Sequence, residues 1–170
     1  DNAFYGVTSL VTITIPASVT SIGVEAFRSA SKLTTVTFEA DSSLNSIGPY
    51  AFSYTKIGSI TIPASVTSIG DSAFINSSQP SYQYLTSVTF DGVSSLETIG
   101  PDAFKYNKIG SITIPASVTS IGDSAFREAR SLTTVTFDGV SALETIGDYA
   151  FRYATSLTSI TIPASVTSIG

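Results

Sequence analysis

The stretch TIPASVTSIG at residues 113–122 decides the fold of this chain, because it is repeated without change at 14–23, 61–70 and 161–170. Identical segments at a nearly constant spacing predict a repeat architecture. Around these segments, the dipeptide Ala-Phe and the closing pair Ile-Gly recur along the whole sequence. The chain is therefore expected to be built from copies of one structural unit.

Cutting the sequence after each Ile-Gly pair divides it into seven units with no residue left over. The units are 1–23, 24–48, 49–70, 71–100, 101–122, 123–147 and 148–170. Two kinds alternate, which we call TIP units and VTF units after their motifs. The VTF units carry an acidic turn within 36–48, 88–100 and 135–147. An inserted loop at 75–84 lengthens the fourth unit to 30 residues, and its Ser, Gln, Pro and Asn content suits the surface.

The apolar positions of the fifth unit predict its cross-section. Ile112 and Ile114 are two residues apart, as in a strand with one buried face, and Pro115 ends that strand. The step from Gly122 to Phe126 indicates a turn in which Asp123 caps a short helical segment. We therefore predict one repeat solenoid over 1–170, a right-handed coil with one short parallel strand and one short helical or 3-10 turn per unit of about 23 residues.

No unit of this size can bury its apolar face alone, so successive units must stack at roughly 4.8 Å. Stacking would place the recurring phenylalanines in one continuous interior column. Each ring would contribute roughly 1.5–3 kcal/mol on burial. The column members are Phe4, Phe27, Phe52, Phe74, Phe104, Phe126 and Phe151.

The composition argues against most kinds of chemistry. The chain has no Cys, Met, Trp or His, so thiol chemistry and His-dependent nucleophilic triads are excluded, and we expect neither an enzyme nor a cofactor. The carboxylates that a glycosidase or a calcium site would need recur at equivalent turn positions, which indicates a structural role. The net charge of −5, with scattered cations, disfavours nucleic acid. No apolar run is long enough to insert into a membrane.

The units resemble the BspA-like, or Treponema pallidum-type, leucine-rich repeats over the whole chain. Residues 10–23 match the first part of that family's pattern, and residues 123–129 match the second part. The family's Cys is replaced by Val7, Ala30, Ala129 and Ala154 in four units. The resemblance implies a leucine-rich-repeat solenoid of a surface or secreted protein, linked with adhesion to host or matrix proteins and with cell–cell association. It supplies no catalytic residues.

Two rows of side chains are candidates for contact with a partner. Tyrosine is enriched in protein interfaces, and the tyrosines lie near the Phe column and in the inserted loop; the alternative is that their rings cover the edges of the column. These candidates are Tyr50, Tyr54, Tyr82, Tyr84, Tyr106, Tyr149 and Tyr153. A ladder of outward hydroxyls is expected on the strands, at Thr12, Thr14, Thr35, Thr37, Thr61, Thr89, Thr113, Thr134, Thr136 and Thr161. Such a ladder could order water in an ice-binding protein, but Thr is also simply a good strand former. Asn76 begins a candidate glycosylation sequon.

Both ends of the sequence are ordinary repeat without a visible polar cap. An uncapped parallel edge favours continuation of the array or head-to-tail self-association. The sequence is thus expected to be part of a longer array. We predict a non-enzymatic extracellular or cell-surface protein that binds other proteins, whether host, matrix or self. A structural block of a filament or surface layer is the alternative, because four copies of one segment are identical.

Overall fold

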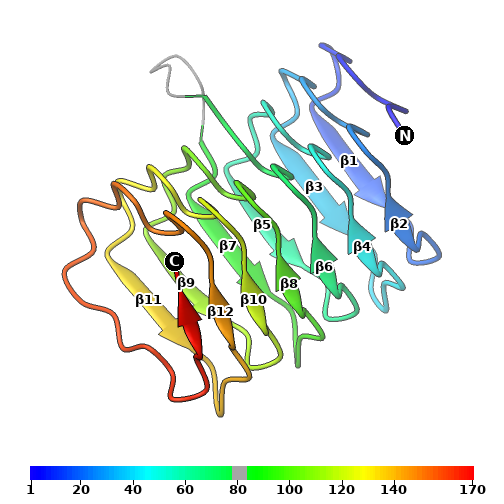
Figure 1. Ribbon diagram of the computed structural model, residues 1–170. Coiled ribbons are helices and arrows are strands. Elements are labelled where there is room, and N and C mark those ends of the chain that lie inside the picture. The colour runs from blue at the N-terminus through cyan, green and yellow to red at the C-terminus, as the bar shows by residue number, and fades with distance from the viewer. Residues whose placement is uncertain (78–83) are drawn as a thin grey trace.

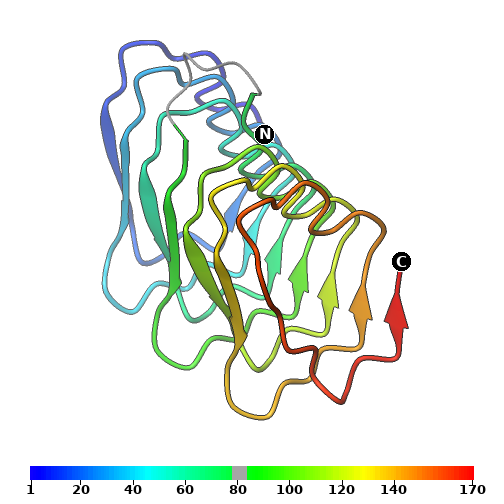
Figure 2. The same cartoon turned by 90° about the vertical axis from the view of Figure 1, so that its left-hand side faces the viewer.

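The computed structural model describes residues 1–77 and 84–170, and these form one coil of about seven turns. Successive turns stack side by side along a single axis, with the N-terminus at one end and the C-terminus at the other (Figure 1). Viewed from the side, each turn has two strand-bearing walls and a tight corner where the chain winds back (Figure 2). The predicted solenoid is confirmed.

The longer strands occupy one wall and alternate exposed and buried side chains. They are β1 (Thr12–Ile15), β3 (Thr35–Phe38), β5 (Ser59–Ile62), β7 (Ser87–Phe90), β9 (Ser111–Ile114) and β11 (Thr134–Phe137). They form three separate parallel ladders, β1 with β3, β5 with β7 and β9 with β11. In each ladder a TIP unit is paired with the VTF unit that follows it. Residues 159–162 have the sequence of β5 and β9 but lie in no strand.

A second, shorter strand in every unit was not predicted from the sequence. These strands are β2 (Ser21–Ile22), β4 (Ser46–Ile47), β6 (Ser68–Ile69), β8 (Thr98–Ile99), β10 (Ser120–Ile121), β12 (Thr145–Ile146) and β13 (Ser168–Ile169). They form one continuous parallel sheet of seven strands in chain order. The expectation of one strand per unit was wrong, because two residues are too few to show the alternation by which a strand is recognised.

Proline explains why the longer strands pair in twos. In the first ladder the amide of Glu39, just past β3, donates to the carbonyl of Ile15 at 3.0 Å. The residue in the equivalent place past β5 is Pro63, which has no N–H to donate back to β3. The same holds for Pro115 past β9. Each VTF-to-TIP junction therefore lacks a ladder bond that each TIP-to-VTF junction has.

The corners that carry the phenylalanines are chains of tight turns, and no helix occurs in the described part of the chain. The amides there alternate between two acceptors: Arg28 donates to Glu25 within the unit at 3.1 Å, and Phe27 donates to Ala51 of the next unit at 2.8 Å. Because every second amide is used between units, the hydrogen bonding of a helical turn cannot form. Asp123 was expected to cap a helical segment of its own unit. Its Oδ1 instead accepts a hydrogen bond from Asp148 N of the next unit at 2.9 Å.

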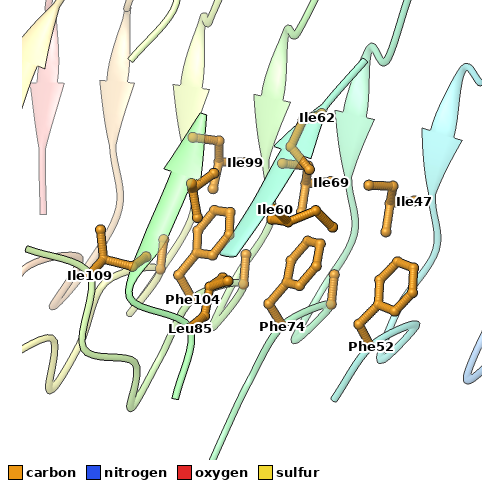
Figure 3. Close-up of a cluster of buried hydrophobic side chains, with 14 of the residues drawn as sticks. Ile47, Phe52, Ile60, Ile62, Ile69, Phe74, Leu85, Ile99, Phe104 and Ile109 are labelled. Atoms are coloured by element: carbon orange, nitrogen blue, oxygen red, sulfur yellow. The ribbon is translucent and has the colours of Figure 1, made fainter. Parts of the chain in front are cut away.

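The interior is the predicted phenylalanine column, flanked by aliphatic side chains from both strand walls. Adjacent rings are nearly parallel, with centroids 5.0–5.4 Å apart, and all seven rings take part. In Figure 3 the rings of Phe52, Phe74 and Phe104 lie beside Ile47, Ile69 and Ile99 of the short-strand sheet. The central rings are fully buried, whereas Phe4 is 40% exposed at the end of the stack. The column is thus a continuous core that thins only at its end.

The glycine that closes each unit is required by its close approach to the preceding corner of the coil. A Cβ on Gly122 would lie 2.6 Å from the backbone nitrogen of Pro101, and a Cβ on Gly70 would lie 2.7 Å from that of Pro49. Backbone atoms cannot move away from such a contact without separating the units. The recurring Ile-Gly pair therefore sets the distance at which the corners stack.

Candidate functional site

The outer surface has two sides of different chemistry. We call the segments between each Ile-Gly pair and the next longer strand the turn side, and the segments from the longer strand to the next Ile-Gly pair the strand side. All eight Lys and Arg residues and all eight Tyr residues belong to the turn side. The candidate sites predicted from the sequence are divided between the two.

The backbone of the turn side holds the tyrosines outward. Two positions per unit, two and six residues after the closing glycine, repeatedly have positive φ. Long side chains at these positions point away from the core, because the Ala and Phe between them point inward and are buried, whereas the short side chains of Ser72 and Ser124 are themselves buried. Five of the seven candidate tyrosines lie at such positions. They are Tyr50 (φ 54°), Tyr54 (57°), Tyr106 (62°), Tyr149 (60°) and Tyr153 (63°).

Cations lie over most of these rings. The guanidinium carbon of Arg28 is 5.0 Å from the centroid of Tyr50 and 5.8 Å from that of Tyr54, and Arg152 is 4.9 and 4.7 Å from Tyr149 and Tyr153. Lys105 Nζ is 5.6 Å from the centroid of Tyr106, and Lys108 Nζ is 4.3 Å from that of Tyr84. Tyr149 and Tyr153 are exposed, while Tyr50, Tyr54, Tyr84 and Tyr106 are half-buried. Tyr82 lies outside the described residues.

A pocket of about 260 Å³ lies on the turn side, next to the inserted loop. Tyr84, Tyr106, Lys108 and Arg130 are among its lining residues. Arg130 Nε donates to Glu128 Oε2 at 2.7 Å, and this hydrogen bond to a carboxylate raises the pKa of the guanidinium above its ordinary value. The pocket differs from the repeating surface in combining two rings, two cations and a carboxylate.

A buried asparagine fastens the two ends of the insertion. Asn107, which is 1% exposed, donates from Nδ2 to the carbonyl of Phe74 at 2.8 Å and accepts from Leu85 N at 3.2 Å. It occupies the position at which other units have Ala30 or Ala129. Asn107 was not predicted as a site residue, although it was a visible signal as the one Asn at a position held by Val7, Ala30, Thr55, Ala129 and Ala154 in other units.

The structure places the sequon residue Asn76 in the interior. Its side chain is buried, and its Oδ1 accepts from the amide of Ser77 at 2.9 Å. A glycan on Asn76 would require this side chain to turn outward, so the folded corner does not present the amide for modification.

On the strand side, the threonine ladder is divided into pairs. All its members are exposed on the longer strands and on residues 159–162. Within each two-stranded ladder the outer hydroxyls bond to one another at 2.9 Å, Thr14 to Thr37, Thr61 to Thr89 and Thr113 to Thr136. Between ladders there is no such bond among the residues that the structure describes. The hydroxyls therefore do not form the uninterrupted array that a regular ladder would give.

Three grooves lie on the strand side, one over each TIP unit that follows a VTF unit. Groove A lies over the third unit, groove B over the fifth and groove C over the seventh, with volumes of about 520, 680 and 680 Å³. They arise because the VTF turns are two residues longer than the TIP turns and project as ridges. Hydroxyls of the Thr and Ser rows line them, together with Phe38, Phe90 and Phe137. The grooves were not predicted from the sequence, although the longer acidic turns that form their walls were visible in it.

Neither a metal centre nor a membrane span is indicated by the residues at hand. No group of three or more acidic side chains within residues 1–77 and 84–170 is arranged to hold a metal ion. Over the same residues, no helix has the length and apolarity needed to cross a bilayer. A coil of stacked units with one apolar interior and a varied outer surface defines a repeat scaffold of the leucine-rich-repeat kind.

The chain belongs to the family described as the BspA type leucine rich repeat region. The family model matches in six copies over residues 1–95 and 75–170, which together cover the whole sequence. No curated protein matches the chain. The family resemblance seen in the sequence is thereby confirmed.

Solved structures of bacterial proteins share the fold. The leucine-rich repeat protein of T. pallidum is 26% identical, with a TM-score of 0.63, over 99% of this chain and 64% of that one. A leucine-rich cell surface protein from Faecalibacterium prausnitzii is 27% identical, with a TM-score of 0.57, over 95% and 57%. The pneumococcal vaccine antigen PcpA is 22% identical, with a TM-score of 0.51, over 92% and 51%. This chain thus spans between half and two thirds of the length of these relatives.

Proposed function

We propose that this chain is the scaffold of a non-enzymatic cell-surface or secreted protein, and that it mediates adhesion by binding other proteins through its turn side. The observation that carries the proposal is the set of outward tyrosines with cations over their rings. Asn, Asp or Gly would adopt positive φ with less strain than a bulky ring. Rigid aromatic rings beside Arg and Lys form the kind of surface that contributes most to protein interfaces.

The family supports the surface location. The F. prausnitzii relative is described as a cell surface protein, and the low share of charged residues, 12%, with 52 Ser and Thr among 170, suits an extracellular setting. The pocket beside the insertion adds chemical variety that a purely structural array would not need. Nothing in this arrangement provides paired groups for acid–base chemistry, which supports a binding role.

The test measures adhesion of beads coated with the chain to surfaces carrying purified matrix proteins or the chain itself. A variant with Tyr54→Ser, Tyr106→Ser and Tyr153→Ser is compared with a control on exposed strand-side threonines outside the grooves, Thr12→Ser, Thr20→Ser and Thr145→Ser. We expect saturable adhesion that falls at least about tenfold in the tyrosine variant, since interface aromatics are often worth more than 1.4 kcal/mol each. Equal loss in both variants, or no saturable adhesion of the unaltered chain, would contradict the proposal.

A second candidate is a filament or layer built by head-to-tail stacking. Phe4 and Ile169 are exposed at opposite ends of the coil, at 40% and 60%, and would be covered by such a contact. Against it, each ladder within the chain pairs a TIP strand with a VTF strand, whereas two stacked copies would bring TIP onto TIP. Sedimentation over a wide concentration range decides between them. A monomer at high concentration argues against stacking, and growing assemblies support it.

A further inference from the structure

The strand side carries only one sign of charge. Its segments contain six carboxylates, all in VTF units, and no Lys or Arg. These are Glu39, Asp41, Asp91, Glu97, Asp138 and Glu144. The turn side holds the other seven carboxylates and all eight cations, so it is close to neutral. The net charge of −5 thus arises from the grooved side, and the cations that looked scattered along the sequence are segregated in space.

The ridges between the grooves end in apolar side chains. Val93 and Val140 are 94% and 96% exposed, each at the tip of an Asp-Gly-Val-Ser turn in which the glycine has positive φ. Groove B lies between these two tips, and Asp138 lines it. Groove A has Asp41 on one wall and Asp91 on the other. The ridges of the fourth and sixth units therefore each offer an apolar tip beside groove B, which Asp138 lines.

The spacing of the grooves selects the shape of a ligand. They recur every second unit, and units stack at 5.0–5.4 Å along the Phe column, so neighbouring grooves are about 10 Å apart. A polyproline II segment repeats every three residues, or about 9 Å, and presents every third side chain on one face. A segment running along the solenoid axis could place one side chain in each groove while the residues between cross the ridges. A β-strand, with same-face side chains every two residues, would not keep this register.

We propose that the strand side is a docking surface for an extended, cationic polypeptide segment with Lys or Arg at every third position and apolar residues or proline between. The cations enter grooves A to C. Carboxylates attract them in grooves A and B, and each of the three grooves supplies hydroxyls and one ring, that of Phe38, Phe90 or Phe137. The apolar residues rest on Val93 and Val140. This surface is separate from the tyrosines, so the two proposals fail or stand independently.

The experiment measures fluorescence anisotropy of labelled peptides titrated with the unaltered chain. The probe has about four Lys-Pro-Pro triplets, enough at roughly 3.1 Å per residue to cross three grooves. The comparison peptides are Lys-Pro repeats with the same number of lysines, Glu-Pro-Pro repeats and Gly-Pro-Pro repeats. We expect the Lys-Pro-Pro peptide to bind most tightly, and its affinity to fall with added salt. Equal binding of the Lys-Pro peptide, or tighter binding of an uncharged one, would overturn the proposal.

Matched variants separate a groove effect from a net-charge effect. Asp41→Asn, Asp91→Asn and Asp138→Asn remove three charges from turns where Asn is well tolerated. Asp71→Asn, Asp102→Asn and Asp148→Asn remove three from the turn side. We expect about tenfold weaker binding for the first set and less than about twofold for the second, because exposed ion pairs are individually weak and act at short range. The same loss in both sets would show that net charge alone is responsible and would reject the docking surface.

Discussion

The two sides of the coil share one core but differ in how they use the repeat. On the strand side every unit presents similar hydroxyl rows, and the units differ mainly in the alternation of short TIP turns with longer, acidic VTF turns. On the turn side the backbone repeats just as strictly, yet the residues at equivalent positions change from unit to unit: Glu25, Tyr50, Ser72, Asp102 and Ser124 occupy one such position. The backbone can therefore repeat strictly while the side chains at equivalent positions differ, and these differences are concentrated on the turn side.

Removing a central ring should damage both sides together, because they share the Phe column. Phe104 is fully buried, whereas Phe4 is 40% exposed to solvent. We expect Phe104→Ala to lower the free energy of unfolding by about 3–5 kcal/mol, and Phe4→Ala by about 1 kcal/mol. Urea denaturation followed by circular dichroism measures both. Equal losses at the two positions would mean that the column is not a continuous core.

Replacement of glycine should be tolerated less well at the corner where the two sides meet than in the segment that leads into a longer strand. A Cβ at Gly122 would lie 2.6 Å from a backbone nitrogen, whereas a Cβ at Gly110 would have no atom within 4 Å, and neither glycine has positive φ. We therefore expect Gly122→Ala to destabilise the chain by about 3 kcal/mol and Gly110→Ala to leave it unchanged or slightly more stable. Thermal unfolding of the pair tests this. If Gly122→Ala unfolds like the unaltered chain, the glycine does not set the stacking distance.

Loss of the Asn107 side chain should destabilise the turn side locally, at the insertion in the fourth unit. Asn107→Ala removes both hydrogen bonds that fasten the insertion and leaves Leu85 N without its side-chain acceptor. We expect a loss of about 2 kcal/mol and faster amide hydrogen exchange at Leu85, with little change at Leu132 in the sixth unit. Thr113→Val, which removes an exposed hydroxyl pair on the strand side, serves as the control and should cost about 0.5 kcal/mol. Uniform exchange changes along the chain would contradict a local clamp.

Much of this architecture was predictable from the sequence. The repeat of TIPASVTSIG, the two-residue spacing of Ile112 and Ile114 and the recurring phenylalanines were enough for the solenoid, the longer strands and the column. The short strands were not predictable, since two residues give no pattern. The helical turn was expected wrongly because Ala125 and Phe126 suggest local hydrogen bonding, while the amide of Phe126 donates to Ala150 of the next unit.

The candidate sites were predicted less completely, and for a physical reason. Residue types identify tyrosines and threonines, but grooves and charge segregation depend on which turns project and which side of the coil a residue faces. The two extra residues in each VTF turn were visible, yet their consequence, a ridge beside every TIP unit, follows only once the units are stacked. Arg28 was missed because its partner rings, Tyr50 and Tyr54, lie in the next unit.

The smallest expected change in the free energy of unfolding is that of Tyr149→Asn, and this substitution tests most directly whether the turn side differs in function from the strand side. Tyr149 is 58% exposed, has φ of 60° and lies 4.9 Å from the guanidinium of Arg152. Replacing it with Asn loses an exposed cation–π contact of about 0.5–1 kcal/mol and relieves strain of about 1 kcal/mol at positive φ. We therefore expect Tyr149→Asn to change the free energy of unfolding by less than about 0.5 kcal/mol, since the two effects oppose each other.

If stability is unchanged while bead adhesion falls, the ring is retained for contact with a partner and not for the fold. Tyr50→Asn supplies the matched comparison, because Tyr50 is half-buried against Arg28 at the same position of an inner unit. Its loss should lower stability by about 1 kcal/mol more than the loss of Tyr149, as more apolar area becomes exposed. Should Tyr149→Asn instead unfold the chain as readily as Tyr50→Asn, the tyrosines cover the edge of the Phe column, and the proposed binding role of the turn side is contradicted.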